Sequence, residues 1–253
     1  MNEALRPIAS AMWTAYETLA MGLGLGFLAL LCLVWLPFAL ILHLVLPRRW
    51  GRPLGRTAIA LGFRVYLRFL SLFCACRFDL AALDGLRREA PLIVVANHPS
   101  LLDAVMILSR FPDMVCIMKA ALMKNPLLGA AARLARYIPN DTPLEMILGA
   151  CDELRAGAKL LIFPEGTRTR NFPLGPCSAG AGLIAGRAGA PVQALLIEFS
   201  SPYLGKAWPL WRRPQLPLRF AVRLGRRFPP PPDAAAFGLE LERYLRAELA
   251  ARQ

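Results

Sequence analysis

The chain has 253 residues, of which 56% are hydrophobic, and a formal net charge of +13. This length suits one moderate catalytic domain with an appendage, and the hydrophobic share lies above the usual ~45–50%, which indicates a membrane-associated part. The positive charge permits nucleic-acid binding, but the sequence has no recognition motif of aromatic and basic residues, which argues against that class.

The N-terminal region contains an apolar segment long enough to cross a membrane. Residues 18–47 include no Asp, Glu, Lys or Arg, whereas a spanning helix needs only about 20 residues. A signal peptide is the alternative, but the apolar stretch is too long and no clear small-residue cleavage site follows it. We therefore predict that residues 1–56 form an N-terminal hydrophobic, membrane-embedded helical segment.

Cations crowd directly after this segment and predict its orientation. The first of them are Arg48, Arg49, Arg52 and Arg56. Such cations favour anionic headgroups by roughly 1 kcal/mol each, and the positive-inside rule places the rest of the chain in the cytoplasm. This predicts a bacterial-type inner (cytoplasmic) membrane with the catalytic domain on its cytoplasmic face. A single span fits the sequence, and so does a re-entrant hairpin broken at Pro37.

Residues 57–78 show helical spacing of apolar residues, with Arg64 and Arg68 four positions apart. The pattern predicts an interfacial amphipathic helix whose cations lie at headgroup level. A core helix with one exposed stripe is the alternative.

Residues 79–253 are predicted to form an α/β domain with a mostly parallel sheet flanked by helices. Short apolar runs predict strands at 92–96, 115–118, 159–163, 192–199 and 218–224. Periodicity and capping residues predict helices at 99–110, 126–135, 141–156, 178–189 and 234–251. Because strands alternate with helices, we expect parallel pairing and a ligand site at the carboxyl edge of the sheet.

Two polar motifs follow predicted strands, so both should lie at this edge. The first is NHPSLLD, from Asn97 to Asp103. Because Pro99 disfavours helical geometry at the residue before it, His98 is expected in a loop and Asp103 in the next helix. A neutral imidazole accepts a proton near neutral pH, and a carboxylate neighbour fixes its tautomer. His98 is therefore a candidate general base, although a helix cap with an ordinary first-turn acid is the alternative.

The second motif is FPEGTR, from Phe163 to Arg168. The forked cation of Arg168 suits a phosphate, and Glu165 can hold an acceptor hydroxyl or brace Arg168. Gly166 lets a substrate approach the backbone closely. The alternative interpretation is a surface turn held by an ion pair.

Together, NHPSLLD and FPEGTR resemble the motifs of the lysophospholipid acyltransferase family, which includes bacterial 1-acylglycerol-3-phosphate acyltransferases. The resemblance covers about residues 90–200. It implies a membrane-bound O-acyltransferase that moves a fatty acyl group from acyl-CoA or acyl carrier protein to the hydroxyl of a lysophospholipid. The implied partners are membrane lipids and the thioester donor, without nucleic acid.

The resemblance also implies roles for individual residues. It assigns catalysis to His98 and Asp103, and it assigns the shape of the acceptor site to Glu165, Gly166, Thr167 and Arg168. No metal or redox cofactor is implied, and the six cysteines contain no CxxC pair that would suggest a zinc site.

Two departures from the family pattern weaken lysophosphatidate as the acceptor. Asn140 stands where an arginine is expected, and Gly175 to Ser178 replace a stretch that often carries a lysine. A non-phosphate lipid or specialised-metabolite acceptor is therefore an alternative. Two further alternatives are an acyl hydrolase in which His98 activates water and a non-catalytic membrane-binding protein.

Overall fold

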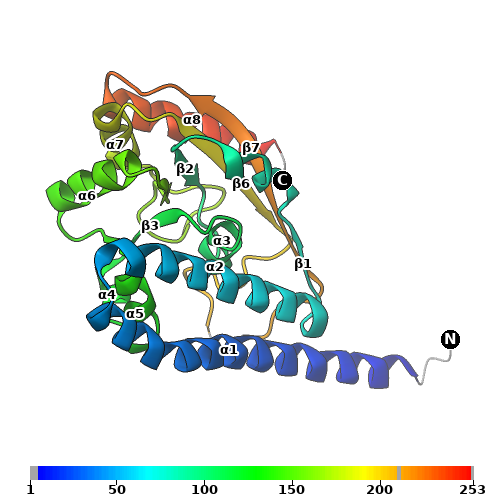
Figure 1. The fold of residues 1–253 in the computed structure, drawn as a ribbon. Coiled ribbons are helices and arrows are strands. Elements are labelled where there is room, and N and C mark those ends of the chain that lie inside the picture. The colour runs from blue at the N-terminus through cyan, green and yellow to red at the C-terminus, as the bar shows by residue number, and fades with distance from the viewer. Residues whose placement is uncertain (1–4, 210–211, 252–253) are drawn as a thin grey trace.

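The computed structural model describes residues 5–209 and 212–251 and shows a helical hairpin packed against an α/β domain (Figure 1). The hairpin consists of α1 (Leu5–Val45) and α2 (Arg48–Phe73). Within the described ranges, one stretch of α1, Ser10–Val45, is long and apolar enough to cross a membrane by length and composition.

The domain is built on a seven-stranded sheet with the order β1-β7-β6-β2-β5-β3-β4. The strands are β1 (Cys76–Asp79), β2 (Ile93–Ala96), β3 (Met114–Met118), β4 (Ile138–Pro139), β5 (Lys159–Ile162), β6 (Val192–Phe199) and β7 (Leu218–Phe228). All neighbouring strands pair in parallel except β6 and β7. The predicted α/β class with a mostly parallel sheet is therefore confirmed. The two strands that precede the motifs, β2 and β5, are buried along their whole length, which explains their uninterrupted apolar sequences.

Helices cover both faces of the sheet. They are α3 (Leu102–Leu108), α4 (Ala120–Met123), α5 (Pro126–Leu134), α6 (Pro143–Arg155), α7 (Gly180–Ala188) and α8 (Ala234–Ala250), with short 3₁₀ helices at Ala81–Leu83 and Gly85–Arg88. One face carries α6, α7 and α8, and the other carries α3, α2 and then α1 (Figure 1). Side chains of Asn125 and Asp233 cap α5 and α8 by accepting hydrogen bonds from first-turn amides.

Three predictions about the N-terminal part need correction. α1 continues through Pro37, and the chain reverses at Pro47 instead. The helix predicted for 57–78 begins at Arg48 and ends at Phe73, so the predicted boundary after residue 56 falls inside α2. Residues 76–78, the last of the predicted helix, belong instead to β1, which pairs with β7. The predicted segments 1–56 and 79–253 also include residues outside the described ranges.

Three arginines of α2 face the domain and not a headgroup layer. Arg56 is buried, and its Nε donates to the Ala135 carbonyl at 3.0 Å while its Nη2 donates to Glu153 at 2.7 Å. Arg52 donates to the same carboxylate at 3.0 Å. Arg64, expected at headgroup level, is half-buried and donates to the Ser109 carbonyl at 2.6 Å. These contacts fix the hairpin to the α/β domain.

Candidate active site

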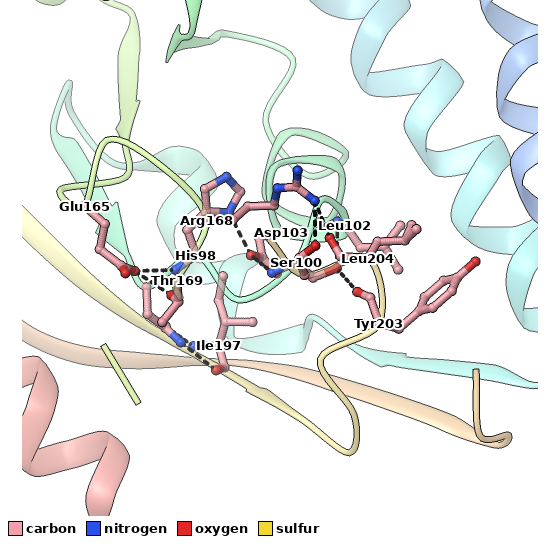
Figure 2. Close-up of polar contacts among 12 residues, drawn as sticks. His98, Ser100, Leu102, Asp103, Glu165, Arg168, Thr169, Ile197, Tyr203 and Leu204 are labelled. Atoms are coloured by element: carbon pink, nitrogen blue, oxygen red, sulfur yellow. Dashed lines mark hydrogen bonds and ion pairs between the residues drawn. The ribbon is translucent and has the colours of Figure 1, made fainter. Parts of the chain in front are cut away.

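The carboxyl ends of β2 and β5 bring the two sequence motifs together. These strands are direct neighbours in parallel register, so the chain segments that follow them leave the sheet side by side at one edge. His98 lies in the loop after β2, and Asp103 lies in the first turn of α3, as predicted. FPEGTR begins directly after β5 and faces this loop (Figure 2).

His98 and Asp103 form a close pair. The distance from His98 Nδ1 to Asp103 Oδ2 is 2.8 Å, and the Asp103 side chain is fully buried whereas 15% of His98 is exposed (Figure 2). The Ser100 amide donates to the same Oδ2 at 2.7 Å. An ionised carboxylate only accepts hydrogen bonds, so this geometry places the proton on Nδ1 and leaves the Nε2 lone pair free.

Burial raises the pKa of Asp103, and the hydrogen bond from His98 and the nearby Ser100 amide lower it in turn. Asp103 Oδ1 has no hydrogen-bond partner within the described residues. The ionised form of Asp103 therefore depends on the two donors at Oδ2.

The rest of His98 is held by FPEGTR. The imidazole stacks on Phe163, with ring centroids 3.9 Å apart and planes inclined by 15°. The His98 amide donates to Glu165 at 3.0 Å, and its carbonyl accepts from the Thr169 amide at 2.7 Å. Ring and backbone are thus fixed by one turn, which leaves little freedom to rotate the imidazole.

Glu165 does not brace Arg168, which was one of the two roles suggested by the sequence. Besides His98, the Thr169 hydroxyl donates to its carboxylate at 2.8 Å (Figure 2). The Gly175 amide also donates to it at 2.8 Å. These three groups, and not Arg168, are its partners among the described residues. Gly166 has a φ of +63°, in the left-handed region that favours glycine, so the turn itself requires this residue.

Thr167 and Arg168 lie on the open side of the turn. Arg168 Nη1 donates to the carbonyls of Leu204 and Gly205 at 2.7 and 2.9 Å, and burial lowers the Arg168 pKa while nearby Asp103 raises it. The Thr167 hydroxyl lies 2.9 Å from Lys206 Nζ and 3.5 Å from Lys119 Nζ.

The sequence predictions missed both lysines. Lys119 directly follows β3, so the rule that ligands bind at the carboxyl edge could have identified it. Lys206 comes from the long segment between β6 and β7 and carries no local signal.

Asn97 and Ser100 were also missed as supporting residues. The Asn97 side chain makes two hydrogen bonds with the Ile197 backbone, at 2.8 and 3.0 Å, and so continues the pairing of β2 with β6 beyond the last strand residue. The Ser100 hydroxyl donates to the Tyr203 carbonyl at 2.7 Å and accepts from the Leu102 amide (Figure 2). These contacts hold the His98 loop on both sides.

Residues 77–198 match the sequence model of the acyltransferase family. A chloroplastic 1-acyl-sn-glycerol-3-phosphate acyltransferase of Brassica napus, BAT2, is 33% identical over 129 residues, which are 49% of this chain and 38% of the relative. A Pseudomonas aeruginosa 1-acyl-sn-glycerol-3-phosphate acyltransferase is 28% identical over 178 residues, which are 63% of this chain and 67% of the relative. The chain thus matches little more than a third of the plant relative's length.

A solved structure has the same fold. The crystal structure of the 1-acyl-sn-glycerophosphate acyltransferase PlsC from Thermotoga maritima superimposes with a TM-score of 0.68 and 19% sequence identity. The match covers 92% of this chain and 95% of the other.

The three hydrogen bonds of Glu165 predict that Glu165→Gln destabilises the protein. An amide nitrogen in place of one oxygen faces an N–H or O–H donor at this half-buried site, and a hydrogen bond to a charged group contributes about 1.5–3 kcal/mol. Guanidinium denaturation in non-ionic detergent measures the change. Glu240→Gln is the matched control, because Glu240 forms an exposed pair with Arg226 and such pairs contribute about 0–1 kcal/mol. Equal stability of the two variants would contradict the bracing role of Glu165.

Proposed function

Because residues 77–198 match the sequence model of the acyltransferase family, we propose that the chain belongs to this family and transfers a fatty acyl group from an acyl thioester to the hydroxyl of a lysophospholipid. The observation that carries this proposal is the His98–Asp103 pair, with 2.8 Å between Nδ1 and Oδ2, at the carboxyl edge of the sheet. The relatives from Brassica napus and Pseudomonas aeruginosa are 1-acyl-sn-glycerol-3-phosphate acyltransferases, which supports this class of acceptor.

In the proposed reaction, His98 Nε2 takes the proton of the acceptor hydroxyl as its oxygen attacks the thioester carbonyl carbon. Asp103 stabilises the imidazolium that forms, as the carboxylate does in a Ser-His-Asp triad. The tetrahedral intermediate then collapses, the C–S bond breaks, and the imidazolium returns its proton to the departing thiolate. The products are the new ester and the free thiol, and His98 is neutral again.

The cations near Thr167 favour a phosphate-bearing acceptor. The charge of Lys119 is the main cause of the lowered pKa of Lys206, with Arg170 and Arg168 adding to it. Like charges held this close are stabilised by a bound anion. Lys119 and Lys206 thus supply cations that the sequence pattern lacks at Asn140. The Asn140 side chain instead accepts from the Ala120 amide, next to Lys119.

We place the helical hairpin in the plane of the membrane. α1 is long enough to span, but it runs beside α2, and its C-terminal part packs against α5 (Figure 1). A perpendicular α1 would carry this part of the α/β domain into the lipid. Large apolar side chains are exposed along both helices, among them Leu23, Leu30, Leu33, Phe38 and Ile41 in α1 and Leu61, Leu72 and Phe73 in α2. The hairpin therefore suits insertion into one leaflet, on the cytoplasmic face of the inner membrane.

The mechanism predicts that His98→Ala and Asp103→Asn each lower turnover by about 10²–10⁴-fold or more, since each removes part of the general base. Mass spectrometry of the lipid products measures the effect. The control is His43→Ala, because His43 lies in α1 and is the only other histidine. Wild-type turnover in either variant would contradict the mechanism, and fatty acid release without an acceptor would favour the hydrolase.

The acceptor proposal predicts that Lys119→Gln raises the KM for lysophosphatidate about 10-fold, as expected for one lost charge-assisted contact. The KM for monoacylglycerol, which has no phosphate, is expected to stay unchanged. Steady-state assays with both acceptors make the comparison, and Lys124→Gln, at an exposed lysine at the end of α4, is the control. Equal use of both acceptors by the wild-type protein would contradict phosphate recognition.

In-plane insertion predicts that both chain ends lie in the cytoplasm. A reporter enzyme that is active only in the periplasm is expected to stay inactive when fused to either end, while a cytoplasmic fluorescent reporter is expected to work at both. Periplasmic activity of the N-terminal fusion alone would show that α1 spans the membrane.

A further inference from the structure

A basic groove opens beside the catalytic turn. It has a volume of about 810 Å³ and is lined by residues that directly follow FPEGTR, by described residues of the segment between β6 and β7, and by Glu17 of α1. Thr169 and Gly205 form part of its wall. Thr169 donates to the His98 carbonyl, and Gly205 accepts from Arg168, so the groove adjoins the proposed reaction centre. Its volume is typical of sites for whole small molecules, about 300–1,000 Å³.

The charge of the groove is strongly positive. Its cations are Arg170, Lys206, Arg212 and Arg213. Among the described lining residues, Glu17 is the only carboxylate, and it pairs with Arg213 at 3.2 Å while accepting from the Leu216 amide. The other three cations therefore have no carboxylate in the groove to balance them. Arginine forks are well suited to phosphate oxygens.

Aromatic side chains lie among these cations. The Arg212 guanidinium stands 4.6 Å from the centre of the Trp208 ring, and 43% of Phe172 is exposed. An aromatic face beside arginines is suited to a nucleotide, because a base stacks on the ring while the cations bind its phosphates. A lipid headgroup alone needs neither the ring nor this volume.

We propose that the groove binds the nucleotide part of the acyl donor, so that the donor is an acyl-coenzyme A. The inference rests on the proposed acyl transfer. Coenzyme A carries its thioester at one end of a long pantetheine arm and its phosphates and adenine at the other. A nucleotide site must therefore lie beside the reaction centre and not within it, which is where the groove lies relative to His98. The acceptor phosphate then binds at Lys119, and Lys206 stands between the two sites.

Binding of adenosine 3′,5′-bisphosphate tests the site without turnover. Titration calorimetry on the full chain in non-ionic detergent is expected to show binding that Arg170→Gln combined with Arg212→Gln weakens at least about 10-fold. Arg243→Gln is the matched control, because Arg243 is exposed on α8. Absent binding in the wild-type protein, or equal binding in all three proteins, would overturn the inference.

Donor kinetics separate this inference from the proposed function. The double variant is expected to raise the KM for palmitoyl-coenzyme A about 10-fold and to leave the KM for palmitoyl-pantetheine unchanged. An equal rise for both donors would overturn the nucleotide site. Weaker sedimentation with anionic vesicles and unchanged donor kinetics would instead identify a lipid headgroup site. Bisphosphate binding without transfer from either thioester would support the nucleotide site and contradict the proposed acyl transfer.

Discussion

The Glu165 carboxylate is the constraint on which the site depends, because it joins the loop after β2 to two points in the segment that follows β5. It accepts hydrogen bonds from the His98 amide after β2, from Thr169 in its own turn and from the Gly175 amide further along. These donors stabilise the half-buried carboxylate, since a hydrogen bond to a charged group contributes about 1.5–3 kcal/mol. The same contacts that satisfy Glu165 therefore set the position of His98.

In the proposed membrane-bound state, the hairpin gives the site a fixed relation to the lipid surface. Arg56 is buried against Glu153 and the Ala135 carbonyl, and at Gly55 a Cβ atom would lie only 2.7 Å from the Ala135 amide nitrogen. Such a close approach leaves no room for α2 to slide. In the proposed reaction the acceptor is an amphiphile whose headgroup lies at the membrane surface. A rigid link between the hairpin and His98 therefore holds His98 at a fixed depth relative to that headgroup.

Two positively charged regions meet at Lys206, next to residues 167–170. One is formed by Lys119 and Lys206 around the Thr167 hydroxyl, and the other is the groove with Arg170 and Arg212. Two anionic substrates repel each other unless cations separate them. The arrangement is therefore suited to a reaction in which both the donor and the acceptor carry phosphate.

The sequence by itself determined the strands β2 and β5, the parallel order of the domain, and the loop position of His98, because these follow from uninterrupted apolar runs and from the local effect of Pro99. Its motifs also indicated the resemblance to acyltransferases, with which the match of residues 77–198 to the acyltransferase sequence model agrees. Only the tertiary structure decided what depends on contacts between distant residues. The short strands β1 and β4 form because they pair with β7 and β3. Pro37 is accommodated within α1. Arg56 points into the domain because Glu153 lies opposite. Tertiary contacts likewise decided the positions of Lys206 and Asn97, because local sequence periodicity does not show which loops meet at the edge of a sheet.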